Sequence, residues 1–504
     1  MHILSIDLGT TAIKAAVISP EGRVVGKCVR EYALSTPSPL EVELPVNTYW
    51  DAFKKSIQDL LDMTKVAAGE LGVLGMSVQG ETLVLVDDRG RPIHNAIVWM
   101  DNRAQEEAAI LDQEFPHAVT YEITGQVSIV PTWPAAKILW LKRHRRDLFQ
   151  KTHKFLLLED YFIHRLTGKY VAESSLLSST VYWNIRTKQW WPEMLARLEI
   201  EESRLPEIKE SGEIVGPIMP EVARELGLSD KLVITTGALD QAAGAVGVGN
   251  IRPGLFSENT GAALAICATV DKPFMDPEFR MPCHYHGIPD LYMAHTFTSG
   301  GMVLKWFRDR FCAQEIDVAQ ALGKDAYALL DEEAGHVPPG CGGLVMLPHL
   351  EGAMAPEANP KARGVFFGFT LHHGRAHFAR ATMEAIAFIV KRNIDVLNAL
   401  QIPVNEVICL GGGAKSRLWN QIKADILDKK IVTTANDQDA ACLGAAFIAG
   451  QAVGIYRSLD EAIATSVSVN HTYAPDPAQR EMYATAYARY IKLYENLVSV
   501  FELP

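Results

Sequence analysis

The sequence predicts an α/β protein made of two domains that face each other across a cleft. Predicted strands and helices alternate along most of the chain, and the pattern that opens the sequence begins again near residue 254. The 504 residues are also too many for one hydrophobic core, since a domain holds about 100 to 200 residues. No low-complexity linker separates the halves, so Gly249, Pro253 and the restart of the pattern give domains 1–248 and 249–504.

The first thirty residues predict three short strands joined by tight turns. Apolar and polar side chains alternate over residues 3–6, 13–18 and 24–29. Gly9-Thr10-Thr11 and Pro20-Glu21-Gly22 interrupt the alternation, and glycine and proline favour turns. This order predicts an antiparallel meander.

A helix and a further strand follow the meander. Residues 48–66 repeat apolar side chains at helical spacing, with Asn47 or Thr48 as the expected N-cap. Residues 73–78 form a short apolar run, which is typical of a buried strand. Helix and strand alternate from here, and this order indicates a sheet with helices on its faces.

The second half begins with a strand, a tight turn and a returning strand. Residues 255–257 and 262–268 are the predicted strands, and Glu258-Asn259-Thr260-Gly261 is the predicted turn, which is similar to the opening hairpin. A long helix with one apolar stripe is predicted over residues 377–400. The second half therefore predicts another α/β domain.

The composition is that of an ordinary globular protein with sizeable cores. Apolar residues make up 48% of the chain and charged residues 21%, which excludes disorder on a large scale. The formal net charge is -12, and the short basic cluster at 142–146 lies at helical spacing and reads as a solvated helix face. We therefore expect no nucleic acid as a partner.

The same sequence indicates a cytoplasmic protein that does not cross a membrane. No stretch approaches the roughly 18 consecutive apolar residues of a membrane span, and the N-terminus does not resemble a signal peptide. The 7 cysteines are odd in number, widely spaced and form no C-x-x-C pair, which fits free thiols in a reducing compartment.

Two predicted hairpins carry residues suited to phosphate. Asp7-Leu8-Gly9-Thr10-Thr11 ends an apolar strand, where the glycine lets the backbone approach a ligand and two hydroxyls with successive amides can cradle phosphate oxygens. Asp7 could hold a hydrated Mg²⁺. Residues 258–261 repeat the arrangement in the second half. A polar turn without a ligand is the alternative for either hairpin alone.

Two further segments place polar groups at the ends of predicted strands. Strand 407–410 runs into Gly411-Gly412-Gly413-Ala414-Lys415-Ser416 at the start of a helix, where amides and the helix dipole suit a nucleotide. The spacing is neither that of a Walker A loop nor that of a dinucleotide fingerprint, so a structural glycine turn is the alternative. Asp240 follows another apolar strand, which suits a general base toward a hydroxyl, a helix N-cap, or both.

Taken together, these motifs resemble the FGGY carbohydrate kinase family, which includes xylulose and glycerol kinases. The resemblance covers almost the whole chain. It is carried, in the order of the family, by residues 7–11, 99–103, 137–140, 240–241, 364–369, 381–384 and 411–416.

The resemblance implies two domains of the actin and hexokinase type, each with a ribonuclease-H-like sheet, that close on ATP and a sugar. It implies that Asp240 takes the proton from a primary hydroxyl, and that Asp7 and Asp240 place Mg²⁺. Phosphoryl transfer needs alignment and neutralisation of charge, which these groups and the nearby Lys14 could supply. The residues that it implies for ATP are Gly9, Thr10, Thr11, Lys14, Thr260, Gly261, Gly412, Gly413, Ala414 and Ser416.

The residues implied for the sugar lie mainly in the first half. Trp99 could form a wall of the site or be a core tryptophan, and Asp101 with Arg103 could bind hydroxyls or form an ion pair. Glu81 and Gln241 match acceptor-binding positions of glycerol kinases. The implied acceptor set is Gln79, Glu81, Trp99, Asp101, Arg103 and Gln241.

Two segments near the expected sugar site resemble two different kinds of kinase, so they do not predict one sugar. Residues 77–82 and 95–99 resemble glycerol kinases, except that Gly80 replaces an arginine, which would leave room for a bulkier acceptor. Residues 348–356 follow the xylulose kinase pattern, with Ala353-Met354 in place of Glu-Arg.

We therefore expect an ATP- and Mg²⁺-dependent kinase acting on a primary hydroxyl of a small open-chain sugar, above all a ketopentose such as xylulose. A polyol kinase acting on glycerol, erythritol or a pentitol is the alternative. A non-catalytic ATP-binding protein with an actin-like fold is the third reading. The family resemblance is also compatible with a homo-oligomer.

Overall fold

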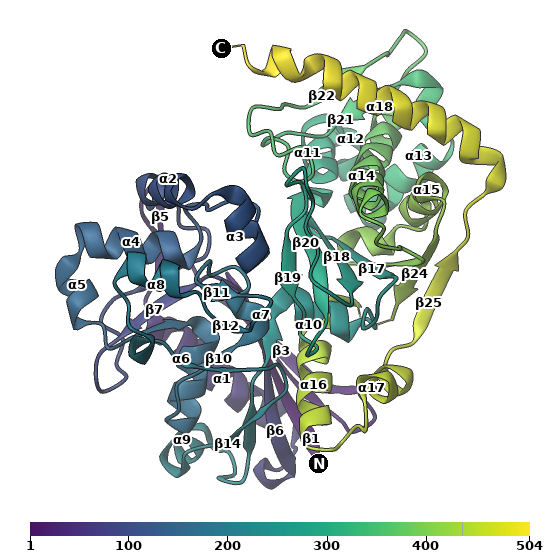
Figure 1. Ribbon diagram of the computed structural model, residues 1–504. Coiled ribbons are helices and arrows are strands. Elements are labelled where there is room, and N and C mark those ends of the chain that lie inside the picture. Colours follow the sequence, from purple (N-terminus) through teal and green to yellow (C-terminus); the bar gives the residue numbers. More distant parts are fainter. Residues whose placement is uncertain (436, 504) are drawn as a thin grey trace.

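A computed structural model describes residues 1–435 and 437–503 and shows two lobes, each built around a mixed β-sheet (Figure 1). The first sheet has the order β14-β15-β6-β1-β2-β3, with β16 beside β6. Its strands are β1 (His2–Leu8), β2 (Ala12–Ile18), β3 (Val24–Glu31), β6 (Leu71–Val78), β14 (Ile214–Pro217), β15 (Val233–Thr235) and β16 (Ala238–Leu239).

The second sheet repeats the arrangement of the first. Its order is β19-β20-β18-β17-β23-β24-β25. In both sheets three antiparallel strands come first, and two strands parallel to the first strand follow on its other side. The predicted meander and the predicted restart of the pattern are confirmed. The strands are β17 (Leu255–Thr260), β18 (Ala263–Val270), β19 (Cys283–Tyr285), β20 (Tyr292–Ser299), β23 (Glu406–Leu410), β24 (Lys430–Thr434) and β25 (Val469–Tyr473).

Two of the predicted element bounds are wrong. The first helix, α1 (Val46–Thr64), begins directly after Pro45 and has no side-chain cap, so neither Asn47 nor Thr48 is the N-cap. Strand β17 continues to Thr260 through the expected turn at 258–261, because it pairs with β18 on one side and with β23 on the other. The predicted long helix is α14 (Arg375–Ala399), and its apolar stripe is buried as expected.

Smaller elements complete both lobes. A five-stranded sheet and several helices form the outer part of the first lobe. Most helices of the second lobe lie at its far end (Figure 1). The strands of the small sheet are β4 (Ser35–Ser38), β5 (Glu41–Leu44), β7 (Leu83–Val86), β8 (Ala96–Ile97) and β9 (Lys154–Leu157). Helices of the first lobe are α2 (Gln105–Glu114), α3 (His117–Thr124), α4 (Pro134–His144), α5 (Arg146–Lys151), α6 (Leu158–Thr167), α7 (Ser174–Leu177), α8 (Pro192–Leu198) and α9 (Pro220–Leu226). Helices of the second are α11 (Gly301–Phe311), α12 (Ala313–Leu322), α13 (Ala326–Gly335), α15 (Arg417–Leu427) and α18 (Arg480–Phe501).

The chain returns to the first lobe late in the sequence. Helix α16 (Ala440–Ala452) packs against β1 and β6, and the Ser5 hydroxyl donates to the Cys442 carbonyl at 2.6 Å. Helix α17 (Leu459–Ser466) lies beside it (Figure 1). A single boundary at residue 248 therefore assigns α16 to the second domain although it covers the first sheet.

Glycines allow α16 to cross closely over α10 (Asp240–Gly247) where the lobes meet. A Cβ at Gly247 would lie 1.9 Å from the Ala440 carbonyl oxygen, and one at Gly444 would lie 1.8 Å from the Ala243 carbonyl oxygen. Only residues without a side chain fit this distance. Asp240 therefore starts a helix that is held between the lobes.

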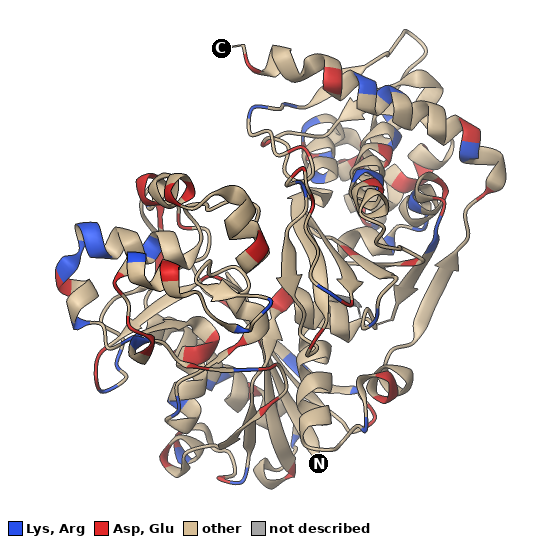
Figure 2. Cartoon of the chain, viewed as in Figure 1, with Lys and Arg blue, Asp and Glu red and all other residues tan. Residues whose placement is uncertain are grey.

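Acidic and basic residues are interspersed over both lobes (Figure 2). The basic cluster at 142–146 joins α4 to α5 and is partly neutralised: Lys142 pairs with Glu199 at 3.0 Å, and Arg143 pairs with Glu106 at 2.7 Å. Within the described residues, no helix is both long enough and apolar enough to cross a bilayer.

Candidate active site

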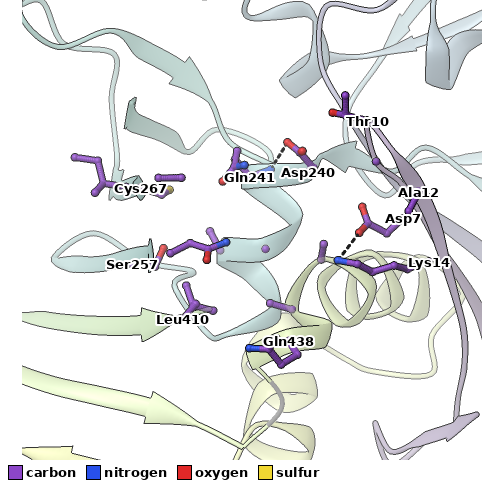
Figure 3. A pocket seen from close by; sticks show the side chains of 18 of the residues that line it. Asp7, Thr10, Ala12, Lys14, Asp240, Gln241, Ser257, Cys267, Leu410 and Gln438 are labelled. Atoms are coloured by element: carbon purple, nitrogen blue, oxygen red, sulfur yellow. Dashed lines mark hydrogen bonds and ion pairs between the residues drawn. The ribbon is translucent and has the colours of Figure 1, made fainter. Parts of the chain in front are cut away.

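A pocket of about 380 Å³ is lined by residues of both lobes (Figure 3). Seven of the predicted catalytic, metal, ATP and acceptor residues line it, namely Asp7, Gly9, Thr10, Thr11, Lys14, Asp240 and Gln241. The other lining residues are Ala12, Gly244, Ala245, Ser257, Asn259, Ala265, Ile266, Cys267, Leu410, Gln438, Ala440 and Ala441. The first hairpin and the start of α10 therefore meet in one cavity.

Asp7 presents a carboxylate to the pocket from the end of β1. One oxygen accepts a hydrogen bond of 3.0 Å from the Ser77 hydroxyl, and the other lies 3.5 Å from Lys14 Nζ. Burial raises the pKa of Asp7, and the Lys14 charge opposes this shift. Lys14 keeps much of its side chain exposed, so its charge is available to a ligand in the pocket.

Asp240 is the first residue of α10, and its Oδ1 accepts a hydrogen bond of 2.7 Å from the Gln241 amide (Figure 3). The N-cap position belongs to Leu239, so Asp240 is not the N-cap. Burial, and next the charges of Asp7 and Glu81, raise the pKa of Asp240 to about 7. A carboxyl with this pKa can accept a proton near neutral pH, as a general base must.

The second hairpin faces the pocket with residues other than those predicted. Side chains alternate along β17, so that Ser257 and Asn259 line the pocket while Glu258 and Thr260 point to the opposite face. The Thr260 hydroxyl, expected near phosphate, is buried and donates to Glu258 at 2.5 Å. Gly261 accepts an amide hydrogen bond of 2.9 Å from Gly301, at the start of α11.

A buried ion pair makes the two hairpins chemically unequal. Lys423 Nζ donates to Glu258 and, at 3.1 Å, to the Thr260 hydroxyl, and the side chains of Lys423 and Glu258 are completely buried. Glu258 is therefore neutralised by a protein cation, whereas Asp7 faces the pocket. Of the two acids, only Asp7 is placed to contact a bound ion.

The glycine loop of residues 411–416 packs against the second hairpin. A Cβ at Gly413 would lie 2.7 Å from Thr260 Cβ, and Gly411 has a φ of 75°, which favours glycine. Gly412 and Ala414 lie in the short turn between β23 and α15, and the Ser416 hydroxyl caps α15 by accepting from the Trp419 amide at 2.9 Å. The loop borders the hairpin, but Leu410 is its neighbour that lines the pocket.

Gln79 and Glu81 do not line the pocket, and Gln79 supports the first hairpin from behind. Gln79 Nε2 donates to the Gly9 carbonyl at 3.1 Å and to the Tyr49 hydroxyl at 3.2 Å. Glu81 accepts a hydrogen bond from the Ser179 hydroxyl, and burial raises the pKa of Glu81. Its charge contributes to the raised pKa of Asp240, so these two carboxyls are neighbours.

Gly80 lies close to Leu239, which precedes Asp240. A Cβ at this position would lie 3.0 Å from Leu239 Cδ1 and 3.8 Å from Ser179 Oγ. Leu239 and Ser179 are therefore the nearest neighbours of this position, and the bulkier acceptor stays a prediction.

Trp99 joins the first hairpin to the opposite lobe. Its Nε1 donates to the Thr10 hydroxyl at 2.8 Å. The Trp99 ring meets the Phe297 ring of β20 edge to face, with centroids 6.4 Å apart. Trp99 is only partly buried, so it is not a simple core tryptophan.

Asp101 and Arg103 form the ion pair that was one of their two predicted roles. Arg103 donates to both oxygens of Asp101 at 2.9 and 2.8 Å and to Glu43 at 2.7 Å. The Val42 amide also donates to Asp101, whose side chain has no exposed surface. These bonds occupy the Asp101 carboxylate within the protein.

Lys137 holds together the two segments that carry Glu81 and Trp99. Its Nζ donates to the backbone carbonyls of Glu81 at 3.2 Å, Val98 at 3.0 Å and Trp99 at 3.3 Å. Three acceptors match the three protons of an ammonium group. Burial lowers the pKa of Lys137 to about 7.

Ser257, Cys267 and Gln438 also line the pocket, although no sequence motif predicts them as site residues. Ser257 and the singled-out Asn259 could have been placed from the period-2 alternation of a strand extended through the expected turn. Gln438 and the start of α16 come from a segment without a phosphate-type motif, and only the packing of α16 across the lobes brings them to the pocket.

Comparison with known families identifies this architecture. The family model described as "FGGY family of carbohydrate kinases, N-terminal domain" matches residues 2–247, and the model of the C-terminal domain matches residues 267–453. The chain belongs to the FGGY family of carbohydrate kinases. The two lobes are accordingly the two α/β domains of an actin- and hexokinase-like fold, as the sequence predicts.

Similar members of the FGGY family include both gluconokinases and xylulose kinases. The chain is 29% identical to the gluconokinase of Bacillus subtilis (strain 168), over 99% of this chain and 96% of that protein. It is also 29% identical to the xylulose kinase of Escherichia coli (strain K12), over 98% and 99%. The xylulose kinase structure from Rhodospirillum rubrum covers all of both chains with a TM-score of 0.92 at 28% identity. The chain is thus a sugar kinase of the FGGY family, whose members use ATP.

Proposed function

We propose that this FGGY kinase transfers the terminal phosphoryl group of ATP to a primary hydroxyl of a small open-chain sugar, above all a ketopentose such as xylulose. The observation that carries the proposal is the meeting of Asp240 with the first hairpin in one pocket. A carboxyl with a pKa of about 7 is suited to take the proton of an attacking hydroxyl. A protein that only binds ATP has no use for such a base.

Residues of the first hairpin are suited to the phosphate end of ATP. Backbone amides and the hydroxyls of Thr10 and Thr11 offer hydrogen bonds to phosphate oxygens, and Lys14 offers a positive charge. We propose that Asp7 and Asp240 hold Mg²⁺, because carboxylate oxygens are the ligands that this ion prefers. When bound, Mg²⁺ supplies neutralisation of the phosphate charge.

The second hairpin and the glycine loop are the proposed site for the rest of the nucleotide. Asn259 faces the pocket, and residues 412–416 join β23 to the N-terminus of α15, where backbone amides favour anions and polar groups. Gly261 and Thr260 act indirectly in this proposal, because they pack beneath the loop.

The charge of the proposed acceptor residues favours a neutral sugar over a sugar acid. Asp240 and Gln241 offer a carboxylate and an amide to hydroxyls in the pocket, and the Glu81 carboxyl is a neighbour of Asp240. The cation among the six predicted acceptor residues is Arg103, whose side chain is 5% exposed and paired with Asp101 and Glu43. A carboxylate substrate would therefore meet negative charge without a free guanidinium among these six residues.

Gluconate is the second candidate acceptor, because the gluconokinase of Bacillus subtilis and the xylulose kinase of Escherichia coli are equally identical to this chain. A polyol such as glycerol, erythritol or a pentitol is the third.

The test is ADP release from Mg²⁺-ATP with a panel of ketopentoses, ketohexoses, aldonates and polyols, with Asp240→Asn as the control. Strong stimulation by a ketopentose supports the proposal. Stimulation by gluconate or by polyols alone would replace the acceptor. ATP binding without stimulation by any acceptor would favour a binding protein without turnover.

We propose a cytoplasmic location, since all seven cysteines are free thiols. Size-exclusion chromatography with light scattering would test the homo-oligomer that the family resemblance allows.

A further inference from the structure

Two completely buried carboxyl groups lie beneath the segment that leads to Asp240. They belong to Glu159 on α6 and Glu173 at the start of α7, and neither side chain has exposed surface. No lysine or arginine within the described residues forms an ion pair with either group. Burying a carboxyl without a charged partner costs free energy, so we expect these two residues to have a role that offsets this cost.

Their hydrogen bonds converge on the backbone of residues 237–239. Glu159 accepts the Gly237 amide at 2.6 Å. The Ser175 hydroxyl accepts the Leu239 amide at 2.9 Å and donates its own proton to Glu173 at 2.6 Å. Both carboxyls thus hold, directly or through one hydroxyl, the residues that precede Asp240.

We propose that Glu159 is a positioning residue. By accepting the Gly237 amide, it fixes the backbone that precedes Asp240 and thereby the position of the Asp240 carboxyl in the pocket. The proposal rests on the proposed role of Asp240 as general base. Side-chain packing cannot replace this bond at Gly237, where a Cβ would lie 1.9 Å from the Met76 carbonyl oxygen. The Gly237 amide ties this part of the chain to α6, in addition to the pairing of Ala238 and Leu239 with β6.

The two carboxyls differ in their hydrogen bonds, although burial raises the pKa of both, that of Glu173 to about 7. Glu173 accepts from the Ser175 amide, the Leu176 amide and the hydroxyls of Ser175 and Ser211, and such donors favour an ionised carboxylate. Glu159 accepts one hydrogen bond, and its other oxygen is buried without a partner. Burial, and next the Glu173 carboxyl, raise the pKa of Glu159 well above its ordinary value.

Two substitutions at Glu159 separate the hydrogen bond from the packing of the side chain. Glu159→Gln keeps the size and an oxygen that can accept from the Gly237 amide, and Glu159→Leu keeps the size but removes the acceptor. Asp160 is the matched control: it is the next residue on α6, equally buried, and accepts from the Leu157 amide at 2.7 Å instead. Asp160→Leu weakens the same helix without touching residues 237–239.

We expect Glu159→Leu to lower kcat by about 10- to 100-fold, the effect of a small displacement of a catalytic group, with an unchanged KM for ATP. Glu159→Gln should keep most of the turnover, and Asp160→Leu should lower the unfolding temperature without this loss of kcat. Equal losses in Glu159→Gln and Glu159→Leu, or equal kcat in Glu159→Leu and Asp160→Leu, would overturn the proposal.

Hydrogen exchange provides a readout that does not depend on turnover. The amides of Gly237 and Leu239 should exchange faster in Glu159→Leu than in the wild type or in Asp160→Leu. If no acceptor supports turnover by the wild type, the proposed function fails, while unchanged exchange in Glu159→Leu would overturn the positioning role itself.

Discussion

The raised pKa of Asp240 predicts that sugar phosphorylation falls steeply below pH 7. The base acts as a carboxylate, so activity is present above its pKa and is lost as the pH falls through this value. With a pKa of about 7, roughly one tenth of Asp240 is ionised at pH 6 and roughly one hundredth at pH 5. The value of kcat/KM for the sugar should therefore fall about 10-fold per pH unit below pH 6.5. An aspartate at its ordinary value of 3.8 would give a flat profile over this range.

The assay should measure the phosphorylated sugar directly, because coupling enzymes have pH profiles of their own. Asp240→Asn should lower turnover by about 10² to 10⁴ fold at every pH, with ATP binding retained. Glu81→Gln should shift the acid limb to lower pH, since the Glu81 charge raises the pKa of Asp240. A flat wild-type profile between pH 5 and pH 8 would refute the raised pKa of Asp240, and near-normal turnover of Asp240→Asn would refute Asp240 as the base.

Three further substitutions test the surroundings of the site. Lys137→Met leaves three buried carbonyls without a donor; it should raise the KM for the sugar and destabilise the fold by about 1 to 3 kcal/mol in denaturant unfolding, more than the half-buried control Lys142→Met. Lys423→Met leaves Glu258 buried and unpaired and should cost about 3 to 5 kcal/mol in the same measurement. Gly444→Ala forces α16 away from α10 and should cost about 1 to 3 kcal/mol, whereas Gly335→Ala, with no atom near its Cβ, should not destabilise the protein.

Local patterns predicted the sheets of this protein better than the ends of its elements. The alternating pattern predicted the positions of β1, β2 and β3 closely, although in the structure only β3 alternates in burial, because β1 and most of β2 are buried on both faces. The predicted N-cap of α1 was wrong, because Pro45 precedes the helix and no side chain forms a capping hydrogen bond.

The register of the second hairpin shows a further limit of local patterns. Residues 258–261 have the composition of a turn, yet pairing with β18 and β23 keeps them extended to Thr260. Extending the strand moves Thr260 to the buried face and Asn259 to the pocket. The motif was found from the sequence, but the side that faces the ligand depends on partners distant in the chain.

The acceptor residues were identified through resemblance, and the structure divides them. Gln241 lines the pocket, whereas Arg103 forms ion pairs with Asp101 and with Glu43 inside the first lobe. Spacing cannot reveal this difference, because Glu43 lies 60 residues away from Arg103.

The return of α16 to the first lobe has a consequence for biosynthesis. The faces of β1 and β6 that α16 covers are complete in sequence once residue 78 has been made, but their cover does not exist until the ribosome has passed residue 452. A nascent first lobe must therefore keep this apolar surface out of unwanted contacts while the second lobe is synthesised. A fragment ending near residue 248 would leave the same surface bare, so the first lobe cannot be produced alone by cutting the chain at one point.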